Sequence, residues 1–167
     1  MALALLNLSC ASGADAGLKN RKLVACSIPP QAYFIKQLLG QDFTVVTLMP
    51  AGANPEQFEP SIQLLRQLSQ AQAFFALMHP HFAFEQQWVH KIRRQNPILR
   101  VYSASGLFTG FGTDPHVWLS PRLMKTYVDA LAKQLSAAFP REAEGINQRH
   151  QSLRHSIDTL DAGLRRS

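Results

Sequence analysis

From residue 22 onward, short apolar runs alternate with segments whose apolar residues recur every three or four positions. The runs are typical of buried strands, whereas a period near 3.6 predicts amphipathic helices. We expect strands at residues 23–27, 43–49, 74–78 and 98–102. The helices that alternate with them are expected at residues 31–39, 61–70 and 84–95.

Strand–helix alternation with short connections indicates βαβ units. The four predicted strands should therefore form an α/β fold, with a four-stranded, mainly parallel sheet and helices on both faces. After a glycine-rich connection at residues 106–113, Ser120 and Pro121 predict a helix start. Residues 141–166 carry a narrow apolar stripe that predicts a long C-terminal helix of about 40 Å, more than a compact domain needs.

The composition fits one ordinary globular domain. The chain has 167 residues, of which 46% are hydrophobic and 17% charged. Its two cysteines cannot form a multi-bridge disulfide framework. Its net charge of +6 is spread along the chain, and no basic run is interleaved with aromatic residues as a nucleic-acid stacking platform requires. We expect no nucleic-acid partner, and a basic-surface nucleic-acid binder is kept as an alternative.

The first 16 residues differ from the rest of the chain. Residues 1–8 are almost all Ala and Leu, and a small-x-small site follows at Ala14 and Ala16. This pattern predicts a signal-peptide remnant, without the usual basic start and too short to span a bilayer. We therefore expect a periplasmic or extracytoplasmic protein. Cys10 is a second candidate feature, as a site of lipid attachment, although Asn7 stands three residues before it where Leu is usual. The alternative for the whole segment is a frayed N-terminal helix.

Ligands of open parallel sheets collect at the carboxyl ends of the strands. Of the six histidines, three follow predicted strands at this edge: His79, His81 and His116. His116 lies between two prolines, where an imidazole loses little entropy on binding a metal. Asp114 either accepts its other ring N–H or forms an Asx turn. A single loop histidine can also be an ordinary polar residue.

Glu56, on the loop after the second strand, supplies a carboxylate that can join His116 as an oxygen ligand of a metal. The alternative is a solvated loop residue. Of His79 and His81, one is expected to reach the same ion more readily than both. The remaining histidines fall on predicted helices and are expected at the surface: His90, His150 and His155.

Enzyme motifs are mostly missing from the sequence. There is no Gly-x-Ser-x-Gly elbow, no Gly-Lys-Ser/Thr phosphate loop and no His-Glu-x-x-His pair. We therefore do not expect an enzyme. The alternative is a metal-assisted hydrolase that uses Glu56 as a base beside an ion bound by His116.

Two longer motifs follow the second and fourth strands. Residues 48–61 read LMPAGANPEQFEPS, and residues 114–121 read DPHVWLSP. Together they resemble the zinc/manganese solute-binding proteins of bacterial ABC importers. Residues 24–29, the pair Phe84 and Glu85, Trp88 and residues 140–160 support this resemblance, which spans nearly all of residues 22–164.

The resemblance implies a rigid, monomeric, two-lobed protein that captures a divalent metal, Zn²⁺ or Mn²⁺, for delivery to an ABC permease in the inner membrane. Residues 22–139 would form the N-terminal metal-binding lobe and residues 140–167 the start of the interlobe helix, with the second lobe missing. Two of the four ligands expected in the family would then be missing, and metal binding would be weaker. We expect a truncated product or a fragment, and the alternative is a lobe that binds within a larger assembly.

The resemblance also assigns the ligands. His116 matches the histidine of the family's Asp-Pro-His motif, and Glu56 stands where the family has its first loop histidine. A carboxylate favours Mn²⁺ or Fe²⁺ somewhat more than imidazole does, although Zn²⁺ also accepts it. A replacement ligand from His79 or His81 is an alternative. The histidine-rich loop of many zinc importers has no counterpart between Tyr102 and Asp114, which weakly disfavours a zinc-scavenging specialist.

Overall fold

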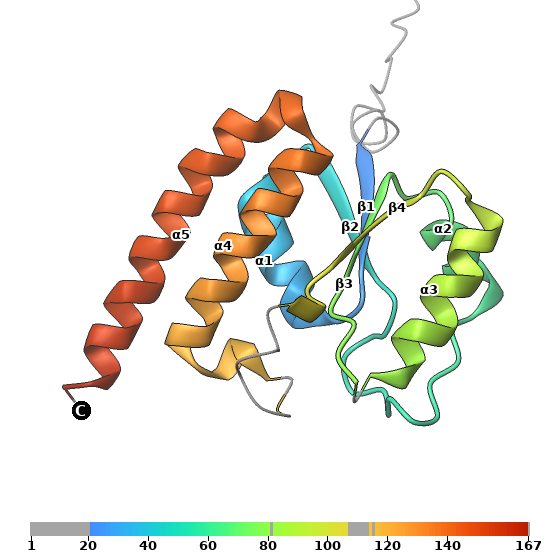
Figure 1. Ribbon diagram of the computed structural model, residues 1–167, viewed down its shortest axis with the longest axis horizontal. Coiled ribbons are helices and arrows are strands. Elements are labelled where there is room, and N and C mark those ends of the chain that lie inside the picture. Colours follow the sequence, from blue (N-terminus) through green and yellow to red (C-terminus); the bar gives the residue numbers. More distant parts are fainter. Residues whose placement is uncertain (1–20, 81, 107–113, 115, 167) are drawn as a thin grey trace, which may run out of the picture.

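The computed structural model describes residues 21–80, 82–106, 114 and 116–166. The expected signal-peptide remnant at residues 1–16, Cys10 and His81 lie outside these residues. Four parallel strands form one sheet in the order β2-β1-β3-β4 (Figure 1). They are β1 (Lys22–Cys26), β2 (Phe43–Thr47), β3 (Ala73–Ala76) and β4 (Arg100–Ser103). The expected α/β fold with a parallel sheet is confirmed.

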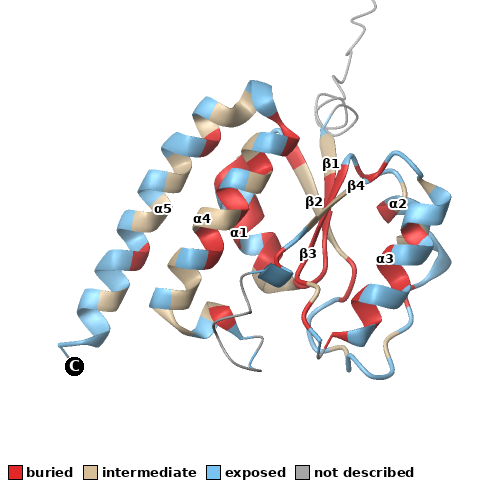
Figure 2. Cartoon of the chain, in the orientation of Figure 1, coloured by how far each residue is buried: buried red, intermediate tan, exposed pale blue. Residues whose placement is uncertain are grey.

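Helices cover both faces of the sheet. On one face lie α1 (Pro29–Leu39), α4 (Pro121–Ala138) and α5 (Ala143–Leu164), and on the other lie α2 (Ile62–Leu68) and α3 (Ala83–Gln95) (Figure 1). Two 3-10 turns, η2 (Val117–Leu119) and η3 (Pro140–Glu142), precede α4 and α5. The buried residues gather on the central strands and on the helix sides turned toward them (Figure 2).

The central strands carry the core. All four residues of β3 are buried, and Val24 of β1 pairs with Val45 on one side and with Ala73 on the other. The rings of Phe75 and Tyr102 stack across β3 and β4 with centroids 5.1 Å apart. Burial on both faces explains why these strands read as continuous apolar runs rather than as alternating ones.

Several element boundaries differ from the sequence prediction, and two of the differences have a clear local cause. The two prolines expected only to stop the first strand also begin α1, because a proline fits the first helical turn, where its missing N–H has no partner to lose. The side chain of Gln31 accepts hydrogen bonds there from the N–H groups of Ser27 and Ile28. Strand β4 begins at Arg100 instead of residue 98, because a turn from Asn96 to Leu99 leaves Ile98 outside the sheet.

Asp129 connects α4 to α5 through two side-chain hydrogen bonds. It accepts hydrogen bonds from His150 at 2.8 Å and from Arg154 at 2.5 Å. His90 and His155 are exposed as predicted, whereas His150 is partly buried because of this contact. The long C-terminal helix is thus confirmed, and it packs along α4 and α1.

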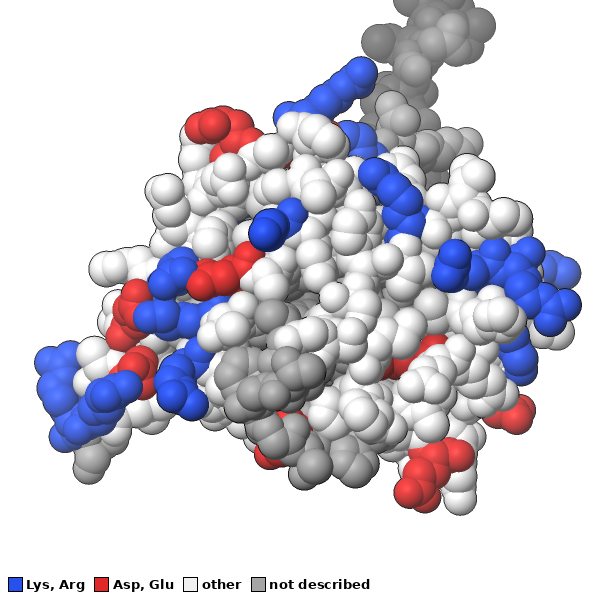
Figure 3. Space-filling model, viewed as in Figure 1, with Lys and Arg blue, Asp and Glu red and all other residues white. Residues whose placement is uncertain are grey.

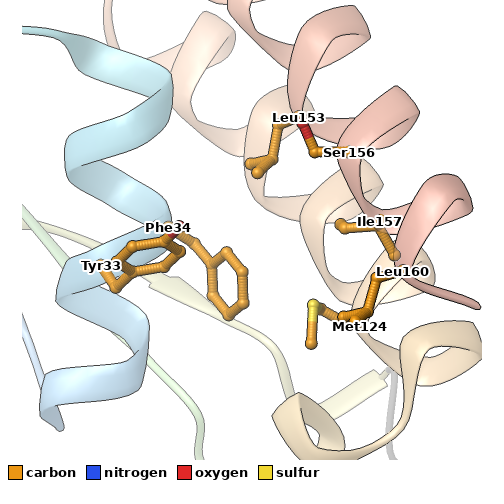
Figure 4. A pocket seen from close by; sticks show the side chains of 7 residues that line it. All are labelled: Tyr33, Phe34, Met124, Leu153, Ser156, Ile157 and Leu160. Atoms are coloured by element: carbon orange, nitrogen blue, oxygen red, sulfur yellow. The ribbon is translucent and has the colours of Figure 1, made fainter. Parts of the chain in front are cut away.

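An apolar groove of about 230 Å³ runs between α1, α4 and α5, with the side chains labelled in Figure 4 as its walls. Toward the end of α5, Leu160 and Leu164 are largely exposed. Among the described residues, no helix is long and apolar enough to cross a membrane.

Candidate metal centre

The loops that follow β2 and β3 and the segment before α4 meet at the carboxyl edge of the sheet, as its parallel topology requires. They border an open cavity of about 420 Å³. The walls are residues 28–30, residues 49–53 and 55, Phe82, His116 and Trp118. Among these described residues the lining is apolar and rich in proline, and His116 is the one titratable side chain.

His116 is held by the residue two positions before it. Its Nδ1 atom lies 2.6 Å from Oδ1 of Asp114, and its backbone N–H donates to the same oxygen at 2.9 Å. Both outcomes considered for Asp114, the ring contact and the Asx turn, are therefore present. Because a carboxylate accepts only, Nδ1 carries the proton in the neutral ring, and the lone pair is on Nε2. The Trp118 ring packs edge-on to the imidazole at 5.2 Å.

The same two contacts act on the carboxyl group. The backbone N–H of His116, and then its ring, hold the pKa of the Asp114 carboxyl below its usual value. The pair remains accessible, with 51% of the His116 side chain and 74% of the Asp114 side chain exposed. A carboxylate that fixes the tautomer and leaves Nε2 free is the arrangement found behind metal-bound histidines.

Glu56 lies on the turn that follows the cavity wall formed after β2. Its backbone N–H donates to Oδ1 of Asn54 at 3.0 Å, and its side chain is exposed. The neighbouring Pro55 lines the cavity, whereas Glu56 is outside the described lining. The loop that carries Glu56 and the segment that carries His116 therefore border one cavity.

His79 and His81 are the two histidines expected as alternative ligands, and the structure describes only the first of them. His79 is only 2% exposed, and its ring packs against Phe82 with centroids 6.0 Å apart. His81 lies outside the described residues. Within the described part of the chain, no group of three or more His, Cys, Asp or Glu side chains is placed to hold a metal ion. Any ion at this edge would therefore need further ligands besides this arrangement.

Glu85 is a buried acid behind this edge whose role the sequence did not reveal. Its carboxylate accepts hydrogen bonds of 2.7 Å from the N–H groups of both Leu77 and Met78, where the chain leaves β3. Burial raises the pKa of the Glu85 carboxyl, and these hydrogen bonds act in the opposite direction. A signal was present in the sequence, because the helical period places Glu85 on the same face as the buried residues Trp88, Val89 and Ile92.

A comparison with known families decides the identity of the chain. The family described as "ZnuA: Zinc-uptake complex component A periplasmic" matches residues 24–167. The chain belongs to this ZnuA family.

Curated relatives of this ZnuA-family chain carry names of binding proteins. The zinc-binding protein AdcA of Streptococcus pyogenes serotype M3 is 27% identical over 168 residues, which cover 83% of this chain and 32% of AdcA. A putative metal-binding protein of Thermotoga maritima is 26% identical over 140 residues, covering 83% of this chain and 50% of that protein. None of these names describes an enzyme.

Solved structures agree with the ZnuA-family assignment. The crystal structure of ZnuA is 28% identical with a TM-score of 0.72, covering 84% of this chain and 56% of that one. Zn(II)-bound AdcA from Streptococcus pneumoniae is 25% identical with a TM-score of 0.69, covering 86% of this chain and 32% of that one. The chain thus spans about one third to just over half of the relatives it matches.

Proposed function

We propose that this chain is the metal-binding lobe of an extracytoplasmic solute-binding component of an ABC importer. The lobe comprises residues 22–139, and residues 140–167 begin the helix toward a second lobe. It captures a divalent metal at the carboxyl edge of the sheet for delivery to a permease in the inner membrane. The observation that carries this proposal is His116, whose Nε2 is left free at the cavity while Asp114 engages Nδ1.

In this proposal His116 supplies the nitrogen ligand and Glu56 supplies an oxygen ligand from across the same cavity. The exposed turn that carries Glu56 can bring its carboxylate toward the ion without disturbing the core. A buried His79 would have to break its packing against Phe82 to do the same, so it is the less suitable replacement.

The cargo in this proposal is Zn²⁺ or Mn²⁺. Zn(II)-bound AdcA supports the first metal. An oxygen ligand in place of an imidazole supports a site that also accepts Mn²⁺. Two ligands from this lobe hold the ion loosely, and water or the second lobe completes the coordination.

Capture and release involve no chemical change of the cargo, so we propose a binding protein without catalytic activity. We further propose that it acts as a monomer outside the cytoplasm, without a nucleic-acid partner, and that a lipid on Cys10 tethers it to the membrane. The periplasmic description of the family supports the compartment.

Isothermal titration of the chain with Zn²⁺ and with Mn²⁺ tests the ligands. His116→Ala should weaken binding at least about tenfold, since even partners of metal ligands contribute that much. His155→Ala is the matched control, because His155 is an exposed histidine on α5. Equal affinities for the His116→Ala variant and the unmodified chain would remove His116 from the site.

The second ligand has its own control on the same loop. Glu56→Ala should weaken binding, whereas Glu59→Ala, which removes another exposed carboxylate three residues away, should not. If both variants lose affinity equally, Glu56 contributes only charge. If neither does, a different residue supplies the oxygen or nitrogen ligand.

A further inference from the structure

The layer formed by α2 and α3 has an uneven charge distribution. Residues 62–100 contain five Lys or Arg residues and one acid, Glu85, which is buried. Arg100 points away from this layer, because its Nη2 atom donates to the carbonyl of Ala138. The other four are exposed and form what we call the α2–α3 basic surface, visible as the blue side chains at the right of Figure 3. They are Arg66, Lys91, Arg93 and Arg94.

The α2–α3 basic surface contains a hollow between the two helices. The side chain of Asn96, just after α3, donates to the carbonyls of Ser69 at 2.8 Å and Ala71 at 3.3 Å, which ties the ends of the two helices together. A hollow of about 440 Å³ lies between them, lined by Leu65, Lys91, Arg94 and Gln95. The Lys91 ammonium lies 3.9 Å from the centroid of the Trp88 ring, which positions the charge by a cation–π contact.

An apolar side chain accompanies the cations. Ile98 lies three residues after the end of α3 and is 88% exposed. Cations beside an exposed apolar residue are the combination that suits a lipid–water interface, where the charges meet anionic headgroups and the apolar group enters the boundary region.

The topology places this surface at the opposite edge from the cavity. In a parallel sheet the helices run back against the strands, so α2 and α3 end at the amino edge, where Lys22 begins β1 directly after Arg21. The carboxyl-edge loops carry exposed acids, namely Glu56, Glu59 and Asp114. The exposed acids at the amino edge, Asp42 and Glu144, belong to the side of α1 and α5 and not to the layer of α2 and α3. A negatively charged surface would therefore attract the α2–α3 side of the amino edge and repel the edge that carries the candidate metal centre.

Helix dipoles account for only part of this arrangement. Cations in the last turn are favoured by the helix C-terminus, which explains Arg66, Arg93 and Arg94 singly. The dipole explains neither Lys91, held over Trp88, nor the exposure of Ile98, nor the lack of any exposed acid among the described residues of the layer.

We propose that the α2–α3 basic surface docks on the anionic headgroups of a phospholipid bilayer. Lipid headgroups and free inorganic phosphate both carry a phosphate group that these cations can bind. We propose that the ligand is the lipid surface and not free phosphate. Docking at this edge leaves the cavity at the carboxyl edge open to solvent, so the docked state would serve metal capture, and delivery to the permease would follow after release from the headgroups. The proposal is independent of metal binding, which uses the other edge.

Cosedimentation with vesicles tests the proposal on the full chain. We expect binding to mixed phosphatidylcholine and phosphatidylglycerol vesicles, weaker binding as salt rises, and little binding to phosphatidylcholine alone. At about fivefold per cation, the triple variant Lys91→Gln, Arg93→Gln, Arg94→Gln should lose on the order of a hundredfold in affinity. Ile98→Ser should weaken binding without changing its salt dependence.

A second triple variant separates position from net charge. Arg122→Gln, Lys133→Gln, Arg166→Gln removes the same charge from exposed positions on or just after α4 and α5 and should bind vesicles normally. Equal losses in both triple variants, equal binding to the two kinds of vesicle, competition by inorganic phosphate alone, or tighter binding to a DNA duplex would each overturn the proposal. Thermal unfolding of the variants shows whether a loss reflects instability, and a stable variant with normal metal titration keeps this test separate from that of the proposed function.

Discussion

The carboxylate of Glu85 and the backbone of Met78 form one unit: Oε2 accepts the Met78 N–H at 2.7 Å, and Met78 has a positive φ of 52°. Such a backbone conformation is strained for a residue with a side chain and needs support from its surroundings. Glu85 gives that support from the first turn of α3. It therefore fixes the path of the chain from β3 through His79 to Phe82, which lines the cavity.

Glu85→Ala should destabilise the fold by about 2–4 kcal/mol, because it leaves the buried N–H of Leu77 and the partly buried N–H of Met78 without an acceptor and opens a cavity. Urea unfolding followed by circular dichroism measures this. Glu59→Ala removes an exposed carboxylate and should change stability by less than about 0.5 kcal/mol. A Glu85→Ala variant as stable as the Glu59→Ala control would contradict the supporting role.

Asp114→Asn should release the tautomer of His116. The carboxylate now holds the proton on Nδ1, and its loss lets the proton move to Nε2, which then cannot bind a metal. Nitrogen NMR of the imidazole should show this shift, and Zn²⁺ affinity should fall by about 10- to 100-fold. Asp158→Asn, at another exposed aspartate, is the control and should leave both unchanged.

The same pair predicts a pH dependence. The folded pKa of Asp114 is lowered from its usual value of 3.8, so the ring contact is complete above that value and is lost as pH falls through the lower folded pKa. Carbon NMR of the Asp114 carboxyl should therefore show a midpoint below 3.8. A midpoint at or above that value would mean that the contact with His116 does not form in solution.

Two glycines should respond to substitution in opposite directions. Gly40 follows α1 with φ 77° and ψ −158°, a region almost restricted to glycine, so Gly40→Ala should cost about 1–3 kcal/mol. Gly163 lies within α5 with nothing within 4 Å of an added Cβ, so Gly163→Ala should gain about 0.5 kcal/mol. Thermal unfolding of both variants checks the signs, and equal signs would show that one of the two local conformations differs.

Cys26 should be chemically inert in the folded chain. Its side chain is fully buried, and burial raises the pKa of its thiol far above the usual range, so little thiolate forms. In a Cys10→Ser background, a thiol reagent should label Cys26 only as fast as the protein unfolds, so labelling should accelerate with urea. Rapid labelling without denaturant would mean that β1 opens locally at its end.

The order of elements was predictable because buried parallel strands and amphipathic helices leave different periods in the sequence. The bounds were less so. Ile98 is apolar and β-branched, yet it lies outside β4 because the turn at Asn96 decides where the strand begins. The amino-acid composition around Ile98 does not show whether its preference for a strand or the turn at Asn96 prevails.

For the site, the sequence indicated His116 and its partner because both lie within three residues, where chain geometry alone brings them together. The burial of His79 and the hydrogen bonds of Glu85 depend on how the segment after β3 packs against the start of α3. The helical period places Glu85 on the buried face, but it does not specify which N–H groups the carboxylate accepts from. Whether Glu56 and His116 share an ion remains a prediction, since it depends on how an exposed turn moves when metal arrives.

The strands that separate the two edges of the sheet have four or five residues. At about 3.3 Å per residue they span roughly 13–17 Å. This exceeds the Debye length of about 8 Å at physiological ionic strength. The repulsion between the cations of the α2–α3 basic surface and an ion in the cavity is therefore largely screened by salt. A protein with a net charge of +6 can still bind a divalent cation at the carboxyl edge of its sheet.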